Sequence, residues 1–297
     1  MKGTACLIRE TREAAAQLEP ARTAPSFSTL TVVAQGQRFC IFCGDTANSR
    51  EHLLPRWLEK LFPADEPAVA FRQVGGVKRS WETKRFSETT KRVCSGCNHG
   101  WLSQLEEVAK PILAPAITRS HNCAFDLRAQ WIAAQWAAKT CYVFQSQGPE
   151  GLVPQMHPAL LRMNGRPAPS VTVFIGAHYR ALRDPANCFY MQRSLSLATG
   201  QGNDKTVTDE FGYMAWLAVG GVSFLVVGHR TGRYIEMLPG EFAHGAFTKI
   251  WPWMSRVVQW PPELLMDPEL IEPLFLDSHP PSFEIRIFDL PVHAEMI

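Results

Sequence analysis

The chain has 297 residues, of which 46% are hydrophobic and 20% are charged, a composition typical of a globular protein with about two domains. Thirty Lys and Arg residues against 28 Asp and Glu give a net charge of +2, which excludes a protein that coats nucleic acid through its overall charge. Residues 1–20 lack the continuous apolar core of a secretory signal, and the apolar run 213–227 is shorter than the roughly 18 residues that a membrane span needs. We therefore expect a cytoplasmic protein with no membrane partner.

Helical patterns dominate the first half of the chain. Residues 1–37 predict a poorly ordered lead-in, because Pro20 and Pro25 and their Ser, Thr and Ala neighbours follow one weak helical stretch. Later helices are predicted from the spacing of apolar residues and from Pro55, which suits the first turn of a helix. They cover 55–62, 98–109 and 128–145, with the polar stretch 67–92 between the first two. The third is apolar on most sides, so we expect it in the core.

Strand patterns dominate the second half. Residues 146–169 are rich in Pro and Gly and predict a connector. Beyond them, β-branched and aromatic residues predict strands, and Gly220-Gly221 predicts a tight hairpin turn. The predicted strands are 170–176, 187–192, the two arms of 213–227 and 282–288. The fold class is therefore α+β, with an antiparallel sheet in the second half.

Four of the eight cysteines form two C-x-x-C pairs, Cys40/Cys43 and Cys94/Cys97. In a chain without a secretory signal this spacing favours a metal over disulfides. Two such knuckles supply the four thiolates of a tetrahedral structural zinc site. The other four are expected as small buried apolar residues, and they are Cys6, Cys123, Cys141 and Cys188.

The residues around the cysteine pairs carry a second pattern. Glu51 and His52 follow the first pair in the run SREHLLPRW, and Asn98 follows the last cysteine in CNHGWLSQLE. In this order the residues resemble the HNH endonuclease family in its zinc-knuckle variety, and the ending looks like that of uncharacterised bacterial and phage HNH-like proteins. The resemblance covers residues 40–98 and implies a treble-clef-like ββα-metal site, in which a hairpin carries the acidic residue and the His while a helix packs across it.

The resemblance also implies roles. His52 would be the general base that takes a proton from the attacking water, Glu51 a metal ligand, and Asn98 a ligand or polar partner at the helix start. An imidazole with a pKa near 6.5 is a competent base at neutral pH, and Mg²⁺ or another divalent cation would stabilise charge developing on the phosphate. Arg50 and Arg56 flank the motif as candidates for phosphate contacts. The implied function is metal-dependent hydrolysis of DNA phosphodiester bonds.

Two departures from the family pattern leave a second hypothesis open. The family has an Asn a few residues before the second cysteine pair, whereas this chain has residues 89–92, TTKR, and the Thr89 hydroxyl is the candidate replacement. The family also has a second metal-binding His on the helix, one turn after the position of Asn98, whereas residues 102–103 are Leu and Ser. His99 is an alternative ligand in place of Asn98. An incomplete set would leave a zinc-binding module that contacts nucleic acid or protein without cleavage.

The chain is accordingly divided into a lead-in at 1–37, an HNH-like zinc module at 38–110 and an α+β domain at 111–297. The last part has no H-E-x-x-H, G-x-S-x-G or phosphate-binding glycine loop. We expect it to recognise a target or partner, and its sequence does not identify the ligand.

Overall fold

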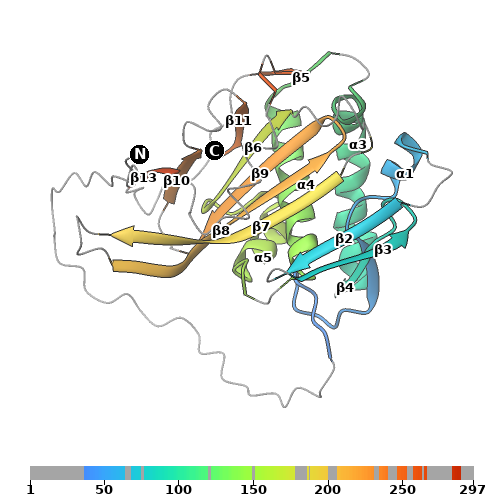
Figure 1. Ribbon diagram of the computed structural model, residues 1–297, viewed down its shortest axis with the longest axis horizontal. Coiled ribbons are helices and arrows are strands. Elements are labelled where there is room, and N and C mark those ends of the chain that lie inside the picture. The colour runs from blue at the N-terminus through green and yellow to red at the C-terminus, as the bar shows by residue number, and fades with distance from the viewer. Residues whose placement is uncertain are drawn as a thin grey trace.

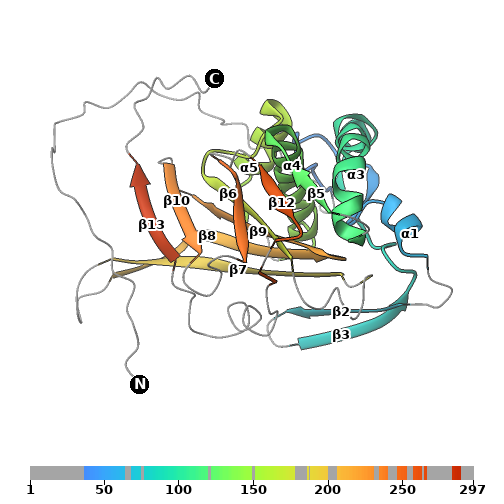
Figure 2. The same cartoon turned by 90° about the horizontal axis from the view of Figure 1, so that it is seen from above.

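The computed structural model describes residues 37–63, 68–74, 77–119, 122–148, 151–177, 186, 188–199, 206–230, 234–239, 246–252, 257–262, 264–265 and 283–288. It contains both helices and antiparallel sheets, so the predicted α+β class is confirmed. A five-stranded sheet lies against a layer of helices (Figures 1 and 2). Apart from Gln37, the predicted lead-in, with its weak helix and Cys6, lies outside the described residues.

The five-stranded sheet is antiparallel throughout, in the order β11-β6-β9-β8-β7. The predicted hairpin is its centre, since β8 and β9 pair from Val219↔Val222 outward. Gly220 forms the turn with φ +54°, a conformation that glycine adopts without strain. The strand bounds are Val171–Ala177 (β6), Cys188–Thr199 (β7), Thr206–Val219 (β8), Val222–His229 (β9) and Phe247–Trp251 (β11).

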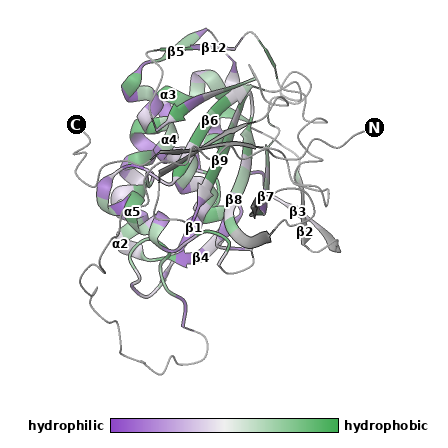
Figure 3. Ribbon diagram, turned by 90° about the vertical axis from the view of Figure 1, so that its left-hand side faces the viewer, coloured by the Kyte–Doolittle hydropathy of each residue, from purple (hydrophilic) through white to green (hydrophobic). Residues whose placement is uncertain are grey.

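Both faces of this sheet are buried, because alternate residues of a strand point to opposite faces. Tyr213, Ala215 and Leu217 of β8 belong to a large core shared with the helices. Met214 and Trp216 belong to a second cluster on the opposite face. Double-sided burial explains why the strands appear as a continuous apolar run in the sequence, visible as green ribbons in Figure 3.

The core helix predicted at 128–145 is α4 (Leu127–Gln145), and it packs on the five-stranded sheet. It begins at Asp126, whose carboxylate accepts a hydrogen bond from the Ala129 amide at 2.7 Å, the usual N-cap contact. Ala133, Trp136 and Val143 are among its fully buried residues.

The helix after the second cysteine pair and the connector before the sheet both differ from the prediction. The helix predicted at 98–109 continues through Pro111 and Pro115: a π-helical turn, η1 (Asn98–Leu102), leads into α3 (Ser103–Thr118). The burial of Leu113, Ala116 and Ile117 outweighs the two missing amide donors. The predicted connector 146–169 contains a helix, α5 (Met156–Asn164), which ends at Gly165 in the left-handed conformation.

The N-terminal part consists of short elements. Strands β1 (Ser49–His52) and β4 (Thr89–Val93) form a two-stranded sheet, and helix α1 (Trp57–Leu61) follows β1. The predicted helix at 55–62 is therefore shorter than expected. The polar stretch holds a separate two-stranded ribbon, β2 (Ala68–Val74) and β3 (Val77–Thr83), which the sequence did not predict.

The predicted boundary at residue 110 falls inside α3. One hydrophobic core runs from Cys40 and Leu58 on one side of it to Trp136 and Val226 on the other. The two parts therefore contribute to one shared hydrophobic core.

Two small sheets complete the fold: β5 (Cys123–Phe125) pairs with β12 (Val258–Trp260), and β10 (Tyr234–Pro239) pairs with β13 (Phe283–Phe288). Trp251 and Trp260 are buried next to cis Pro252 and Pro261. Among the described residues, no helix combines the length and the apolar character that crossing a bilayer requires.

Candidate metal centre and its buried ion pair

The two C-x-x-C pairs meet in space. The sulfur atoms of Cys40, Cys43, Cys94 and Cys97 all lie within 4.8 Å of one another, and Cys43 Sγ and Cys94 Sγ are 3.5 Å apart. Tetrahedral zinc with Zn–S bonds of about 2.3 Å would separate its sulfurs by about 3.8 Å. The four thiols could therefore hold a metal ion such as zinc, and they are the one such group among the described His, Cys, Asp and Glu residues.

The local backbone explains why each pair converges. In the first knuckle the Gly44 amide donates to the Cys40 carbonyl at 2.9 Å, and Gly44 has φ +80°. In the second, the Cys97 amide donates to Cys94 Sγ at 3.4 Å and the Asn98 amide donates to the Cys94 carbonyl at 3.0 Å. Amide donors directed at sulfur stabilise the thiolate that a metal requires.

Charge around the sulfurs also favours a bound cation. Burial raises the pKa of the free Cys97 thiol to about 11, so the thiolate needs a compensating positive charge. Four thiolates and one divalent ion would still carry a net charge of −2. The Arg162 side chain of α5 reaches Cys97, and the sulfur raises the pKa of this guanidinium. Arg162 thus offsets part of that charge from outside the cysteine-rich segment.

His52 lies at the end of β1, where its register partner on β4 is Thr89. It is half-buried, and burial lowers the pKa of its imidazole below 6.5, with Arg56 acting in the same direction. A neutral imidazole therefore predominates at pH 7, which is the form that accepts a proton. The candidate replacement for the family's Asn, Thr89, does lie across the sheet from His52.

Asn98 was expected to open a helix, but the helical segment begins earlier, at α2 (Ser95–Cys97) with Cys94 as its N-cap, and runs directly into η1, of which Asn98 is the first residue. Its side-chain amide donates to Ser49 Oγ and to the Arg50 carbonyl, both at 3.1 Å. The helical segment is therefore attached to β1 two residues before His52. The alternative ligand, His99, is exposed, and its Nδ1 lies 3.0 Å from Ser95 Oγ.

Glu51 points into the protein and takes part in a buried ion pair. Its Oε1 lies 3.2 Å from Nζ of Lys139, a fully buried lysine of α4. The same Nζ lies 2.5 Å from Oε1 of Glu106 on α3. The other oxygen of Glu106, Oε2, accepts hydrogen bonds from the indoles of Trp57 at 2.9 Å and Trp136 at 3.0 Å. We call these five side chains the Lys139 network.

Electrostatics within the Lys139 network favour a charged lysine. Burial alone would lower the pKa of Lys139, but Glu106 and Glu51 outweigh it and raise the pKa above 10.5. Burial raises the pKa of Glu51, which Lys139 opposes and Glu106 reinforces. The network thus connects β1, α1, α3 and α4 through one internal cation.

Sequence reasoning missed Lys139, Glu106 and Arg162. The signal for Lys139 was present, because it is the one charged residue between Arg128 and Gln145 in a helix predicted to be apolar on most sides. A lysine in such a helix needs a buried carboxylate partner. Nothing in the sequence identified which carboxylates those were, since residues 51 and 106 are far away along the chain.

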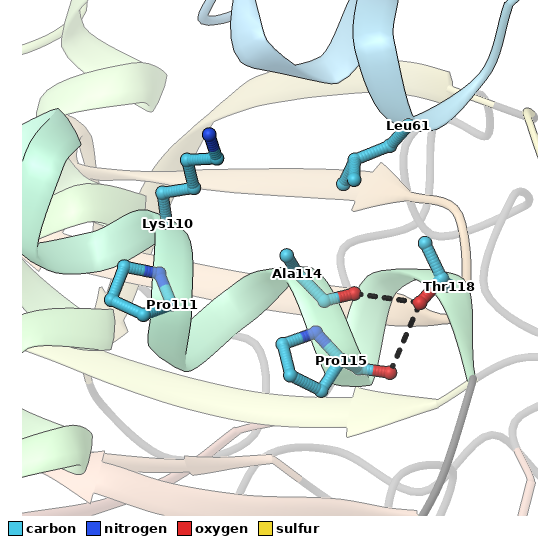
Figure 4. A pocket seen from close by; sticks show the side chains of 6 residues that line it. All are labelled: Leu61, Lys110, Pro111, Ala114, Pro115 and Thr118. Atoms are coloured by element: carbon cyan, nitrogen blue, oxygen red, sulfur yellow. Dashed lines mark hydrogen bonds between the residues drawn. The ribbon is translucent and has the colours of Figure 1, made fainter.

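Two cavities flank α1. One, of about 400 Å³, is lined by Arg56, Trp57, Glu59 and Lys60. The other, of about 520 Å³, lies between Leu61 and the face of α3 that carries Lys110, Pro111, Ala114, Pro115 and Thr118 (Figure 4). The second cavity has a single ionisable lining residue, Lys110, so it lacks the acid, base or ligand set of a catalytic site.

Comparison with known proteins gave no match: no family model, no curated protein and no solved structure is similar to this chain.

Proposed function

We propose that this protein is a metal-dependent endonuclease of the HNH type that hydrolyses DNA phosphodiester bonds, with His52 as general base. The observation that carries the proposal is the attachment of Asn98 to β1, through hydrogen bonds to Ser49 and Arg50. It supports the treble-clef-like arrangement that the motif order implies, because the cysteine cluster and this contact hold the His52 strand against the helical segment that begins at Ser95.

In this proposal His52 takes a proton from the attacking water. The lowered pKa of His52 suits this role, because the imidazole stays free to accept a proton at neutral pH. Thr89, its register partner, is the candidate to orient the ring. A divalent cation such as Mg²⁺ would supply stabilisation of the phosphate charge. The motif order assigns Asn98 and Glu51 to it, although among the described His, Cys, Asp and Glu residues the four cysteines form the one group that could hold a metal.

One observation favours a second candidate, a zinc-binding nucleic-acid or protein interaction module without cleavage. Oε1 of Glu51 is paired with Lys139, so this carboxylate has less negative charge to offer a divalent cation. The residues at the positions of the family's helix His are Leu102, which is buried, and Ser103. This candidate keeps the fold and the cysteine site and gives up the hydrolytic step.

Plasmid nicking separates the two candidates. The full chain, with zinc content confirmed by elemental analysis, is incubated with supercoiled DNA in Mg²⁺ or Mn²⁺, alongside His52→Ala and the matched variant His99→Ala. The endonuclease predicts nicking by wild type and by His99→Ala, and at least a hundredfold loss in His52→Ala, the typical contribution of a general base. Equal rates in wild type and His52→Ala, with both chains folded, would refute it. DNA binding with no nicking in either metal would establish the second candidate.

A further inference from the structure

We propose that the β2–β3 ribbon, with the exposed cations at its base, is the surface that binds the DNA duplex and directs it to His52. This inference rests on the proposed function and names the part of the molecule that would hold its substrate.

Positive charge is concentrated in residues 68–92, the later half of the segment between the two cysteine pairs. Residues 68–92 contain seven Lys and Arg and two Glu, whereas the whole chain has a net charge of only +2. The rest of the protein is therefore slightly acidic. A basic segment on a near-neutral protein is the electrostatic pattern of local binding to a polyanion.

The backbone register of the ribbon pairs two positions that carry the same charge. β2 and β3 pair without a bulge from Ala68↔Thr83 to Val74↔Val77, and the register places Arg72 opposite Arg79. Like charges at directly opposite positions destabilise an isolated antiparallel pair. A polyanion bound along the ribbon would remove this repulsion.

The base of the ribbon adjoins helix α1, as both views show (Figures 1 and 2). Lys84, directly after β3, is 73% exposed and its Nζ lies 2.6 Å from Glu59 Oε2 on α1. Exposed Arg56 and Lys60 line the cavity of about 400 Å³ on this helix. Arg56 also contributes to the lowered pKa of His52, which places this charge close to the imidazole. Cations thus continue from the ribbon to the proposed catalytic residue.

The dimensions of the ribbon favour a duplex over other polyanions. Strands of seven residues extend for about 23 Å at roughly 3.3 Å per residue, about two thirds of a turn of B-DNA. A two-stranded ribbon fits the major groove, which is about 12 Å wide. Arg72 and Arg79 occupy directly opposite positions and therefore share one face of such a ribbon.

The test is the salt dependence of binding to a fluorescent duplex, measured by anisotropy with the zinc-loaded full chain. Arg72→Gln with Arg79→Gln removes two charges from the ribbon, and Arg128→Gln with Arg166→Gln removes two from α4 and from the segment after α5. We expect the ribbon variant to bind at least tenfold more weakly at low salt. Its slope of log K against log salt should fall by about 1.8, since each phosphate contact contributes about 0.9. The matched variant should bind like wild type.

Further arms make every outcome decisive. Arg72→Lys with Arg79→Lys keeps the charge and should restore binding, which excludes a folding defect as the cause. Equal weakening in the ribbon and matched variants, or an unchanged slope in the ribbon variant, would overturn the proposal. The proposal would also be overturned if polyglutamate competed as effectively as duplex DNA at equal charge, because the surface would then suit an acidic protein. His52→Ala should bind DNA like wild type. If the wild type does not nick DNA but its binding depends on the ribbon, the proposed endonuclease activity is wrong and the ribbon proposal stands. If nicking is unaffected in the ribbon variant, the ribbon proposal is wrong and the endonuclease activity stands.

Discussion

The cysteine-rich segment and the five-stranded sheet are stabilised by different kinds of interaction. Around the cysteines the elements are short: β1 has four residues, β4 five, α1 five and α2 (Ser95–Cys97) three. In the other region α4 has 19 residues and β8 has 14, and β8 and β9 are apolar on both faces. Figure 3 shows the contrast, with β4 hydrophilic and the central strands hydrophobic. Short elements gain too little from burial, so the first region depends on thiolates, caps and ion pairs.

The two regions nevertheless meet in one core, and polar contacts cross between them. Lys139 of α4 pairs with Glu51 of β1, and the Gln147 side chain after α4 donates to the Thr89 carbonyl of β4 at 2.9 Å. The regions therefore share one core but differ in the source of their stability. Changes directed at each source should affect the regions unequally.

Loss of the cysteine site should have the largest effect. A structural zinc can supply on the order of 10 kcal/mol of folding free energy, and Cys97→Ser removes one of its four candidate ligands. Hydrogen exchange should then become fast in β1 and β4 while β8 and β9 stay protected. Chelation of the wild-type protein should reproduce the pattern.

Cys123→Ser is the control, because its partly exposed thiol lies outside the cluster. It should leave the bound metal and the exchange of β1 and β4 unchanged. If Cys97→Ser instead exposes β8 and β9 together with β1 and β4, the regions share one cooperative transition and the contrast in their stability fails.

Lys139→Met tests the connection between the regions. The change keeps most of the side-chain volume but leaves Glu51 and Glu106 buried without their cation, which typically costs about 3–5 kcal/mol. Urea unfolding should show this loss, and adding Glu51→Gln should recover part of it. Lys110→Met on the exposed face of α3 is the matched control and should be near neutral. A loss in Lys139→Met no larger than in Lys110→Met would show that the network contributes nothing.

His157→Gln tests the contribution of a buried polar side chain next to the sheet. His157 is fully buried, with Nδ1 3.0 Å from the Tyr213 hydroxyl and Nε2 2.9 Å from Ser170 Oγ. Burial lowers the pKa of His157 to about 4, from 6.5. Below pH 6.5 the His157 imidazole is protonated in the unfolded chain but stays neutral in the folded chain. The stability present above pH 6.5 is therefore lost as the pH falls towards 4.

The expected loss is up to about 3 kcal/mol, at about 1.4 kcal/mol per pKa unit. Urea titrations at pH 7.5 and 5 should show a smaller pH dependence in His157→Gln than in wild type. The exposed His99 is the control, and His99→Gln should retain the wild-type dependence. An unchanged difference between the two pH values in His157→Gln would mean that other groups dominate acid destabilisation.

The fold was predictable where burial is continuous and periodic. The strands of the 213–227 run and helix α4 appear in the sequence because their residues are apolar along their whole length. The ribbon was missed because its strands pair with each other alone and lack a continuous apolar pattern. The prediction ended this helix at residue 109, before Pro111, because local propensity carries no information on the tertiary packing that stabilises α3 beyond that point.

The site was predictable where chemistry requires close spacing along the chain. Two C-x-x-C pairs specify four sulfurs at one point, and the structure brings them together. The partner of Glu51 was not predictable, because Lys139 lies 88 positions away and only the packing of α4 against β1 makes them neighbours. The sequence indicated which residues could act, but not which of them are already paired.

Lys84→Gln should have the smallest effect, and it isolates burial as the cause of the larger ones. Lys84 Nζ lies 2.6 Å from Glu59 Oε2, and Lys139 Nζ lies 2.5 Å from Glu106 Oε1, so the two ion pairs have nearly the same geometry. Their exposure differs, because the Lys84 side chain is 73% exposed and that of Lys139 is 1% exposed. The hydrogen bond from Lys84 lowers the pKa of Glu59, but water screens the pair.

We therefore expect Lys84→Gln to lower the free energy of unfolding by less than about 1 kcal/mol, as for other surface pairs, and to lose even this difference in 1 M salt. The Lys139→Met loss should persist in 1 M salt, because ions do not enter the core. Urea unfolding of both variants at low and high salt gives the four values needed. If both losses shrank equally with salt, the buried Lys139 pair would behave as a surface pair, and burial would not explain its larger effect.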